Sequence, residues 1–351
     1  MSQEAGRIKW GIIGCGKIAG KFARALARSR TGALHAVSSR GLEKAESFAG
    51  EHGAARCYGD YASLLSDPEV RAVYVATPHP FHGEWVIKAL RAGKAVLCEK
   101  PLEVNAARVE EIARAARIYG GFLMEAFMYR CHPQTARLVE LLREGVAGDV
   151  RLIRATFGYH GKYDPANIKM NPATAGGAIL DVGCYTVSLA RLVAGVALGR
   201  RVAEPVEVSG QAHIGAESGI DEYAAATLRF EGGILAQVST AVRLALDNRL
   251  TVFGSRGRLT VESPWTGGGL EGGTSRIVIE PEDGPARVEE IACDRWLYGI
   301  QADTAAEGIT RGGPPWPAPD IQDSLGNARA LDRWRAAAGV RYEQWDDPDF
   351  T

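Results

Sequence analysis

Short apolar runs alternate with helical patterns over the first third of the chain. Between the first two runs, Ile18, Phe22 and Leu26 recur every fourth residue, as on the buried face of a helix. Strands that alternate with helices form βαβ units, so this region predicts a parallel sheet that is buried on both faces. The predicted strands are Ile8–Ile13, Ala33–Ser38, Ala72–Ala76, Ala95–Cys98 and Phe122–Met124.

The last helix of this region has a clear start signal. Asn105 precedes the helical pattern of Ala106–Tyr119, and an asparagine side chain there can accept a hydrogen bond from the first turn. Ile112, Ala116 and Tyr119 mark the apolar stripe of the helix.

After about residue 126 the pattern is mostly that of strands separated by glycine turns. Glu231-Gly232-Gly233 predicts a tight hairpin. Successive strands without intervening helices predict an α+β domain with a large, mostly antiparallel sheet, so we divide the chain into domains 1–126 and 127–351. The predicted strands are Val150–Tyr159, Val206–Ile214, Glu222–Phe230, Ile234–Val242 and Asn248–Phe253, and the predicted helices are Pro133–Glu144, Ala178–Ala194 and Ser324–Ala338.

One face of this second sheet is expected to remain without a cover from its own chain. Burying such an open face against a second copy is a natural solution. We therefore hypothesise a homodimer or homotetramer that assembles through the open sheet.

Charge and cysteine usage exclude several classes of protein. The 351 residues contain 41 Lys and Arg against 42 Asp and Glu, a net charge of −1 without a basic block, so we expect no nucleic-acid partner. The six cysteines form no Cys-x-x-Cys pair, which argues against a zinc site and a disulfide framework and predicts a reducing, cytoplasmic location. No histidine pair has ligand spacing beside an acid, so we expect no metal.

The sequence also predicts no membrane association and no secretion signal. We expect no apolar run to reach the roughly 20 residues that a spanning helix needs. The segment Met1–Gly6 is polar and lacks the apolar core of a signal peptide.

The first predicted strand ends in a glycine turn of the type that binds dinucleotides. Gly14-Cys15-Gly16-Lys17-Ile18-Ala19 has the Gly-x-Gly-x-x-Ala spacing and leads into a helical pattern. Gly14 permits the sharp turn, Gly16 lets a pyrophosphate approach the backbone, and Ala19 keeps the helix close to the sheet. The alternative is an ordinary glycine-rich turn between strand and helix.

The end of the second strand predicts NADP as the cofactor, with NAD as the alternative. An NAD site usually has an acid there to hold the ribose 2′-hydroxyl, whereas this chain has Ser38-Ser39-Arg40. The Arg40 guanidinium can pair with a 2′-phosphate or stack on the adenine. Glu43 could still reach a ribose, and Arg40 could be a solvated surface charge.

Three further motifs together resemble the glucose–fructose oxidoreductase and inositol dehydrogenase (Gfo/Idh/MocA) family. They are Glu99-Lys100-Pro101, the stretch Ala76-Thr77-Pro78-His79-Pro80-Phe81-His82, and the segment Gly176–Tyr185. The resemblance covers nearly the whole chain, and 122–130 is most similar to the subgroup of dimeric dihydrodiol dehydrogenases and NADP-dependent D-xylose dehydrogenases. It implies an N-terminal Rossmann domain, a C-terminal α/β domain with an open sheet, and a substrate cleft between them.

The resemblance also implies which loops contact the cofactor. Besides Gly14, Cys15, Gly16, Lys17, Ile18, Ser38, Ser39 and Arg40, the candidates are Ala76, Thr77, Pro78, His79, His82, Glu99, Lys100 and Pro101. For the two histidines, loop residues without a role are an equally good interpretation.

Three residues form the candidate catalytic group. Asp181 and Tyr185 are four apart, so they share one face of a helix. Much of the family has histidine at the Tyr185 position. A free tyrosine has a pKa of about 10, and the Lys100 ammonium is expected to lower the pKa of Tyr185 toward neutrality. Tyr185 would then exchange a proton with the substrate, Lys100 would stabilise negative charge on its oxygen, and Asp181 would orient Lys100 or a second hydroxyl.

Other polar and aromatic residues are weaker candidates, because most residues of these kinds have only structural roles. His160, at the end of a strand, could contact substrate together with Lys100, Asp181 and Tyr185. Further residues that could line the site are His132, Lys162, Lys169, Asn171, Trp296 and Tyr298.

Four functions fit these residues. The first is an NADP-dependent dehydrogenase of a sugar or cyclic polyol, such as D-xylose or another aldose. The second is a trans-dihydrodiol dehydrogenase or a keto-sugar reductase. A redox glycosidase with NAD is disfavoured by the missing acid after the second strand, and an NADP-binding sensor by the presence of Lys100, Asp181 and Tyr185 together.

Overall fold

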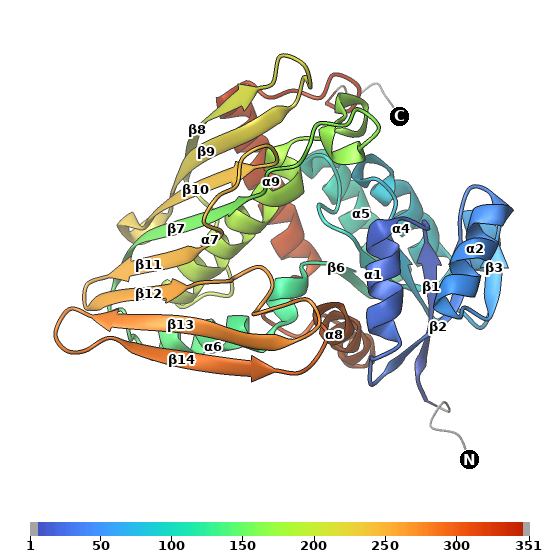
Figure 1. The fold of residues 1–351 in the computed structure, drawn as a ribbon, viewed down its shortest axis with the longest axis horizontal. Coiled ribbons are helices and arrows are strands. Elements are labelled where there is room, and N and C mark those ends of the chain that lie inside the picture. Colours follow the sequence, from blue (N-terminus) through green and yellow to red (C-terminus); the bar gives the residue numbers. More distant parts are fainter. Residues whose placement is uncertain (1–5, 347–351) are drawn as a thin grey trace.

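The computed structural model describes residues 6–346 and contains two sheets that lie side by side (Figure 1). The N-terminal segment with no predicted secretion signal lies, up to residue 5, outside the described residues. The first sheet uses the chain up to Glu125, and the second begins at Val150.

The first sheet has six parallel strands in the order β3-β2-β1-β4-β5-β6, which confirms the predicted parallel sheet. This is the strand order of a dinucleotide-binding Rossmann fold, in which ligands bind outside the carboxyl ends of the strands. The strands are β1 (Ile8–Ile13), β2 (Gly32–Ser38), β3 (Arg56–Tyr58), β4 (Ala72–Val75), β5 (Ala95–Cys98) and β6 (Leu123–Glu125). The helices are α1 (Lys17–Leu26), α2 (Leu42–His52), α3 (Tyr61–Ser66), α4 (His82–Arg91) and α5 (Ala106–Tyr119).

Local signals account for most of these elements. The cap predicted for α5 is confirmed, because the Asn105 side chain accepts a hydrogen bond from the Arg108 N–H at 3.0 Å. The sequence did not predict β3 and α3. Strand β3 has three residues on an edge of the sheet and none is fully buried, so it lacks the apolar run of a central strand.

The second sheet has eight strands in the order β14-β13-β12-β11-β7-β10-β9-β8. Strands β7 and β10 are parallel and the other neighbouring pairs are antiparallel, as the sequence predicts for a mostly antiparallel sheet. The strands are β7 (Val150–Gly158), β8 (Glu207–Ile214), β9 (Asp221–Arg229), β10 (Leu235–Ala241), β11 (Leu250–Gly254), β12 (Gly257–Val261), β13 (Gly273–Pro281) and β14 (Arg287–Cys293).

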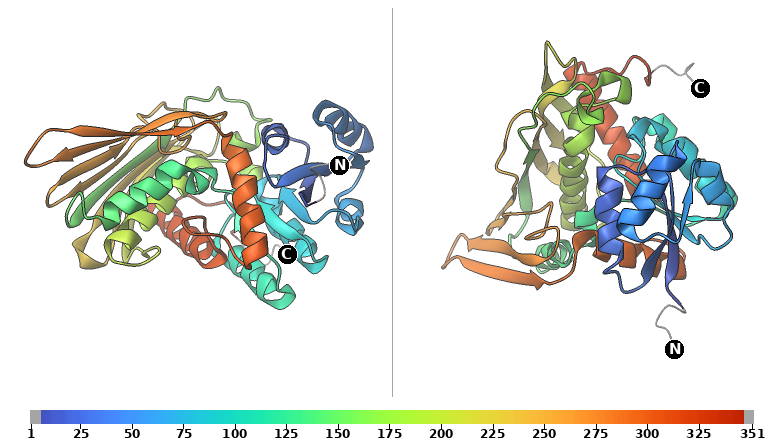
Figure 2. Two further views of the ribbon diagram at one scale, coloured as in Figure 1. Left: turned by 90° about the horizontal axis from the view of Figure 1, so that it is seen from below. Right: turned by 45° about the vertical axis from the view of Figure 1, so that its right-hand side comes forward.

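Helices pack against one face of this sheet, and the other face has no helix over it in either view of Figure 2. The covering helices are α6 (Pro133–Arg143), α7 (Cys184–Ala197) and α9 (Ile321–Ala338). A further helix, α8 (Leu297–Arg311), was not predicted and packs against α1. Hydrogen bonds to Asp303 on α8 and Asp332 on α9 tie the C-terminal part to the first domain.

One stretch, Pro172–Ala197, is long and apolar enough to cross a membrane, with a mean hydropathy of 1.5 over its most apolar part. The expectation that no apolar run is long enough to span a membrane was therefore wrong, because this stretch has the necessary length and composition. The apolar part is completely buried inside the protein, because α7 packs against the second sheet and against its neighbours α6 and α9. Its hydropathy is that of a core helix.

Candidate active site

A single turn of π-helix leads into α7 and carries Asp181. We call Ile179–Gly183 the π-turn. Such turns interrupt the α-helical hydrogen-bond ladder and are frequent at functional sites. Four carbonyl oxygens in and beside it accept hydrogen bonds from side chains, those of Ala178, Asp181, Gly183 and Cys184. The sequence predicted a regular helix here, so the π-turn is a correction to it.

Lys100 reaches the π-turn from the carboxyl end of β5. Its Nζ donates to the Asp181 carbonyl oxygen at 2.6 Å and to Asp181 Oδ1 at 3.0 Å. Burial alone would lower the pKa of Lys100, but the Asp181 carboxylate outweighs it and raises that pKa above 10.5. Burial would likewise raise the pKa of Asp181, but Lys100 and then Lys169 lower it below 3.8. The site therefore holds an ammonium and a carboxylate over the neutral pH range.

Two further groups contact the Asp181 carboxylate. Tyr159 donates to Oδ2 at 2.7 Å, and Lys169 donates to the same oxygen at 3.1 Å. The side chain of Lys169 is 45% exposed while that of Asp181 is 6% exposed, so Lys169 marks the solvent side of the site. Lys100 and Lys169 thus place two ammonium groups around this carboxylate, and such cations favour an oxygen that gains negative charge.

Tyr185 lies beside Lys100 with the ammonium over its ring, 5.2 Å from the ring centroid. Its hydroxyl donates to the sulfur of Met128 at 3.2 Å. Burial, with smaller contributions from Tyr298 and Glu99, raises the pKa of Tyr185 well above 10. The expectation that this pKa is lowered by Lys100 was therefore wrong, because burial, the largest cause of the shift, opposes the phenolate.

Aromatic rings surround Tyr185 and form one apolar wall of the site. The ring centroids of Phe127 and Phe157 lie 5.2 Å from that of Tyr185, and that of Trp265 lies at 5.8 Å. Tyr298, which the sequence suggested for such a wall, is buried and close enough to influence the pKa of Tyr185. Trp296 instead stacks under Arg28.

Tyr159 was not among the residues predicted from the sequence, whereas its neighbour His160 was. Successive residues of a strand point to opposite faces. Phe157 and Tyr159 therefore share the face turned toward Tyr185 and Asp181, whereas His160 is exposed and forms an isolated bridge with Arg243. The alternation was the signal that could have identified Tyr159.

Of the two histidines proposed to contact the cofactor, His82 is buried and His79 is half-buried, and both are engaged with backbone carbonyls. His79 Nε2 lies 2.8 Å from the Ala175 oxygen. His82 lies between two loops, with its ring nitrogens 2.8 Å from the Thr77 oxygen and 2.9 Å from the Pro101 oxygen. Burial lowers the pKa of His79 to about 3 and that of His82 to about 4. Neutral His82 thus fixes the two loops expected to contact the cofactor.

Glu99 is also turned inward. Its Oε1 accepts a hydrogen bond from the Tyr74 hydroxyl, and its Oε2 accepts one from the Lys100 N–H at 3.3 Å. Burial raises the pKa of Glu99 above 4.5. In the Glu-Lys-Pro motif, Glu99 therefore shapes the end of β5 while Lys100 enters the site.

The glycine turn has the space and the donors that a pyrophosphate needs. Gly14 has φ +94°, and a β-carbon there would lie 2.9 Å from the Ala76 carbonyl oxygen. Among residues 6–346, no atom beyond its chain neighbours lies within 4 Å of a β-carbon built on Gly16. Helix α1 starts at Lys17 without a side-chain cap, so its first N–H groups suit an anion.

The three residues after the second strand do not all face the same way. Ser38 is buried and donates its hydroxyl to the Ile12 oxygen, and Ser39 is buried as well. Arg40 is exposed.

A lysine lies near Cys15 of the glycine turn. Burial raises the pKa of the Cys15 thiol to about 11, and the Lys44 ammonium opposes that shift. Lys44 is therefore a further cation near the glycine turn, and the sequence did not single it out.

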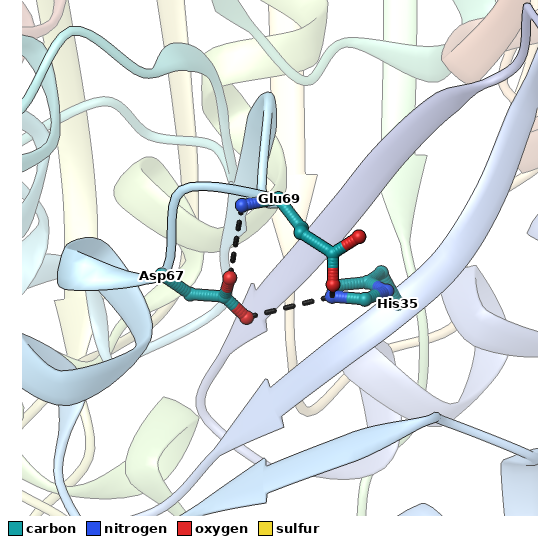
Figure 3. A group of neighbouring side chains, drawn as sticks. All are labelled: His35, Asp67 and Glu69. Carbon is teal, nitrogen blue, oxygen red and sulfur yellow. Dashed lines mark hydrogen bonds and ion pairs between the residues drawn. The ribbon is translucent and has the colours of Figure 1, made fainter.

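A cluster of His35, Asp67 and Glu69 offers three ligand atoms within 4.8 Å of one another (Figure 3). His35 Nε2 lies 3.4 Å from Asp67 Oδ2 and 3.5 Å from Glu69 Oε2. Arg56 already pairs with both carboxylates, and Lys9 pairs with Glu69 at 2.6 Å. Two cations thus balance two carboxylates, which describes an ion-pair network. The absence of a metal stays a prediction.

Family models match both parts of the chain. Residues 8–127 match the GFO/IDH/MocA oxidoreductase family with an NAD-binding Rossmann fold, and residues 135–260 match the GFO/IDH/MocA C-terminal domain. Trans-1,2-dihydrobenzene-1,2-diol dehydrogenase from Mus musculus is 33% identical over 339 residues, which cover 96% of this chain and 98% of the relative. The enzyme of that name from Bos taurus is 35% identical over 347 residues, with the same coverage.

Solved structures of similar proteins extend over nearly the whole chain. KijD10, a 3-ketoreductase from Actinomadura kijaniata in complex with NADP and TDP-benzene, has a TM-score of 0.82 and 30% identity. Aldose-aldose oxidoreductase from Caulobacter crescentus, complexed with glycerol, has a TM-score of 0.83 and 25% identity. Each comparison covers 95% of this chain and 98% of the other.

Proposed function

The chain belongs to the GFO/IDH/MocA family of NAD(P)-dependent oxidoreductases, and from that membership we propose that it transfers hydride between NADP and a ring carbon of a cyclic diol or sugar. The observation that carries the proposal is the ammonium of Lys100, held by Asp181 beside the phenol of Tyr185. The relatives named dihydrodiol dehydrogenase, ketoreductase and aldose oxidoreductase support a cyclic substrate. We take trans-dihydrodiols and keto-sugars as the first substrates to test, and D-xylose and other aldoses next.

In this proposal Tyr185 exchanges a proton with the substrate oxygen. Because burial keeps its pKa well above 10, the phenol carries its proton and can donate it to a carbonyl that is being reduced. The thioether of Met128 is a weak acceptor, so the hydroxyl can turn to a substrate oxygen at little cost. These features favour reduction as the direction in which the resting site is ready to act.

Lys100 would hold the same substrate oxygen and stabilise the negative charge that forms on it. Asp181 fixes the ammonium through two hydrogen bonds, and Tyr159 and Lys169 in turn fix the carboxylate. The aromatic wall around Tyr185 offers a flat apolar surface to one face of a ring substrate. A ring suits this site when the hydroxyls on its edge can meet the Lys100 ammonium and the C–H groups on its face can pack against the aromatic wall.

The residues fit a bound dinucleotide. The turn from Gly14 to Ile18 would hold the pyrophosphate, and the loops Ala76–Pro78 and Glu99–Pro101 would flank the nicotinamide side. When bound, NADP supplies or accepts the hydride. We assign NADP because Arg40 is exposed at the end of β2, where an NAD site would have an acid.

Replacing Arg40 with alanine is expected to raise the KM for NADP by at least tenfold and to leave the KM for NAD within about twofold. A guanidinium paired with a phosphate is a strong, bidentate contact that has no counterpart in NAD. Initial rates with each cofactor give both constants, and Arg30→Ala, an exposed arginine elsewhere, serves as the matched control. An unchanged KM for NADP in the Arg40 variant would refute the assignment.

The function itself is tested with a panel of trans-dihydrodiols, keto-sugars, aldoses and polyols, each with NADP and NAD in the matching redox state. Absorbance of the reduced nicotinamide follows turnover. We expect saturable turnover of a cyclic diol or keto-sugar with NADP. Turnover of none of these compounds by protein that binds NADP would contradict the proposal.

We also propose that two copies associate through the face of the second sheet that carries no helix. Alternation along the strands puts Tyr223, Leu235 and Val288 on that face, and all three are exposed. Light scattering after size exclusion should give at least twice the monomer mass of 37.6 kDa. Tyr223→Glu with Leu235→Glu should shift the protein to monomer, and an unchanged mass would contradict this interface.

A further inference from the structure

The carboxylate of Asp221 lies against the start of the π-turn. Asp221 begins β9 and has no exposed surface. Its Oδ2 accepts a hydrogen bond from the Ile179 N–H, the first residue of the π-turn, at 2.6 Å. Gly177 has φ +142°, and a β-carbon there would overlap this carboxylate. The chain therefore makes room at Gly177 for an acid that comes from the second sheet.

The contact bears directly on the active site, because Asp181 follows Ile179 by two residues. The Asp181 N–H donates to the Gly177 carbonyl oxygen at 3.0 Å, so the segment from Gly177 to Asp181 is held at both ends. The carbonyl oxygen and side chain of Asp181 in turn bind the Lys100 ammonium. A shift of the π-turn would therefore move both groups that hold Lys100.

We propose that Asp221 is a positioning residue, which caps the π-turn and thereby holds Asp181 and Lys100 where hydride transfer requires them. The reaction that it serves rests on the proposed function. The effect of Asp221 on the order of the π-turn does not depend on any activity of the protein.

The surroundings of Asp221 give the proposal a dependence on pH. Tyr342 donates to Oδ1 at 3.5 Å, and the Arg335 guanidinium, which pairs with Asp346, is near enough to lower the pKa of Asp221. Burial raises the pKa of Asp221 to about 7, against the opposing effect of the Ile179 N–H and of Arg335. Asp221 thus changes its charge near neutral pH.

The two consequences of this titration have opposite signs. The pKa of Asp221 is higher in the folded than in the unfolded protein, so its contribution to stability is fully present below about pH 4 and is lost as the pH rises through 7. The ionised carboxylate, however, makes the stronger hydrogen bond to the Ile179 N–H. If Asp221 had a merely structural role, turnover would fall together with stability as the pH rises. We expect turnover to rise with pH while stability falls.

Hydrogen exchange of the free protein tests the structural half. In Asp221→Ala, amides of residues 177–184 should exchange at least tenfold faster than in wild type. Asp221→Asn keeps an acceptor oxygen and should change them less. Val252→Ala, a buried truncation in β11, controls for lost stability and should cause no selective change there. Exchange of 177–184 in Asp221→Ala no faster than in Val252→Ala would overturn the proposal, whether or not the protein is active.

Kinetics test the catalytic half on protein that turns over the panel substrate. Asp221→Ala should lower kcat at least tenfold with an unchanged Kd for NADPH, while Val252→Ala keeps its kcat. In Asp221→Asn the rise of kcat between about pH 6 and pH 8 should disappear. Burial also raises the pKa of Glu103 and that of Glu125 to about 7, but both variants retain these residues, so they cannot explain that loss. If Asp221→Ala does not fold, the pH profile of kcat in Asp221→Asn decides whether Asp221 has this role. A kcat in Asp221→Ala within twofold of Val252→Ala, or a wild-type pH profile in Asp221→Asn, would refute the role, whereas an inactive wild type would refute only the proposed function.

Discussion

Lys100→Met is expected to lower kcat by about 10³-fold, the largest loss from any single change in the site. Removing one donor that stabilises a developing oxyanion costs about 10²- to 10³-fold, and Lys100 is a full charge that lies in a nearly buried position. Methionine keeps most of the volume of the side chain. The measurement is kcat with the best substrate of the panel, alongside the Kd for NADPH from its fluorescence.

The control for this variant is Lys88→Met, which removes an exposed lysine paired with Glu84 on α4. It should keep the wild-type kcat, because exposed ion pairs contribute little. Lys100→Met should still bind NADPH and still fold, since Lys169 and Tyr159 continue to pair with the Asp181 carboxylate. A kcat above one-tenth of wild type in Lys100→Met would contradict the role of the ammonium.

Tyr185→Phe is expected to lower kcat by about 10²- to 10³-fold, within the range that general acid catalysis contributes. The substitution keeps the ring and its aromatic neighbours and removes only a hydroxyl that donates to a weak acceptor, Met128 sulfur. Stability and the Kd for NADPH should therefore remain close to wild type. Because the pKa of Tyr185 lies well above 10, wild-type reduction should show no loss from its ionisation below about pH 10.

Tyr129→Phe is the matched control. Tyr129 is buried beside Tyr185, and its hydroxyl donates to Ser188, so its loss should cost stability and spare kcat. Tyr159→Phe asks whether the second tyrosine is the proton donor instead. It should lower kcat by tenfold at most, because in our proposal Tyr159 only orients Asp181. A large loss in Tyr159→Phe together with a small one in Tyr185→Phe would exchange the two roles.

The fold was largely predictable because its main signals are local. The glycine turn after Ile13, the cap at Asn105 and the alternation along β9 and β10 each act within a few residues. Elements without such signals were missed. Strand β3 is short and half-exposed, and α8 is held by contacts with α1 that come from a distant part of the chain.

The sequence predicted which residues form the site better than it predicted their chemistry. Lys100 and Asp181 were expected to interact, and they do at 3.0 Å. The direction of the pKa shift of Tyr185 was predicted wrongly, because the sequence shows a neighbouring charge but not the depth of burial. The π-turn and the contact of Asp221 with it also had no local signal, since β9 comes from a separate segment of the chain.

The central claim is that Lys100 and Tyr185 act on one substrate oxygen, and a double-mutant cycle on the rate of hydride transfer tests it most directly. Single-turnover rates are measured for wild type, Lys100→Met, Tyr185→Phe and the double variant, each saturated with NADPH. If both groups serve the same oxygen, the double variant should lose about as much as the worse single variant, because removing either one disables the pair. Losses that multiply in the double variant would mean that the two residues act independently and would contradict the claim.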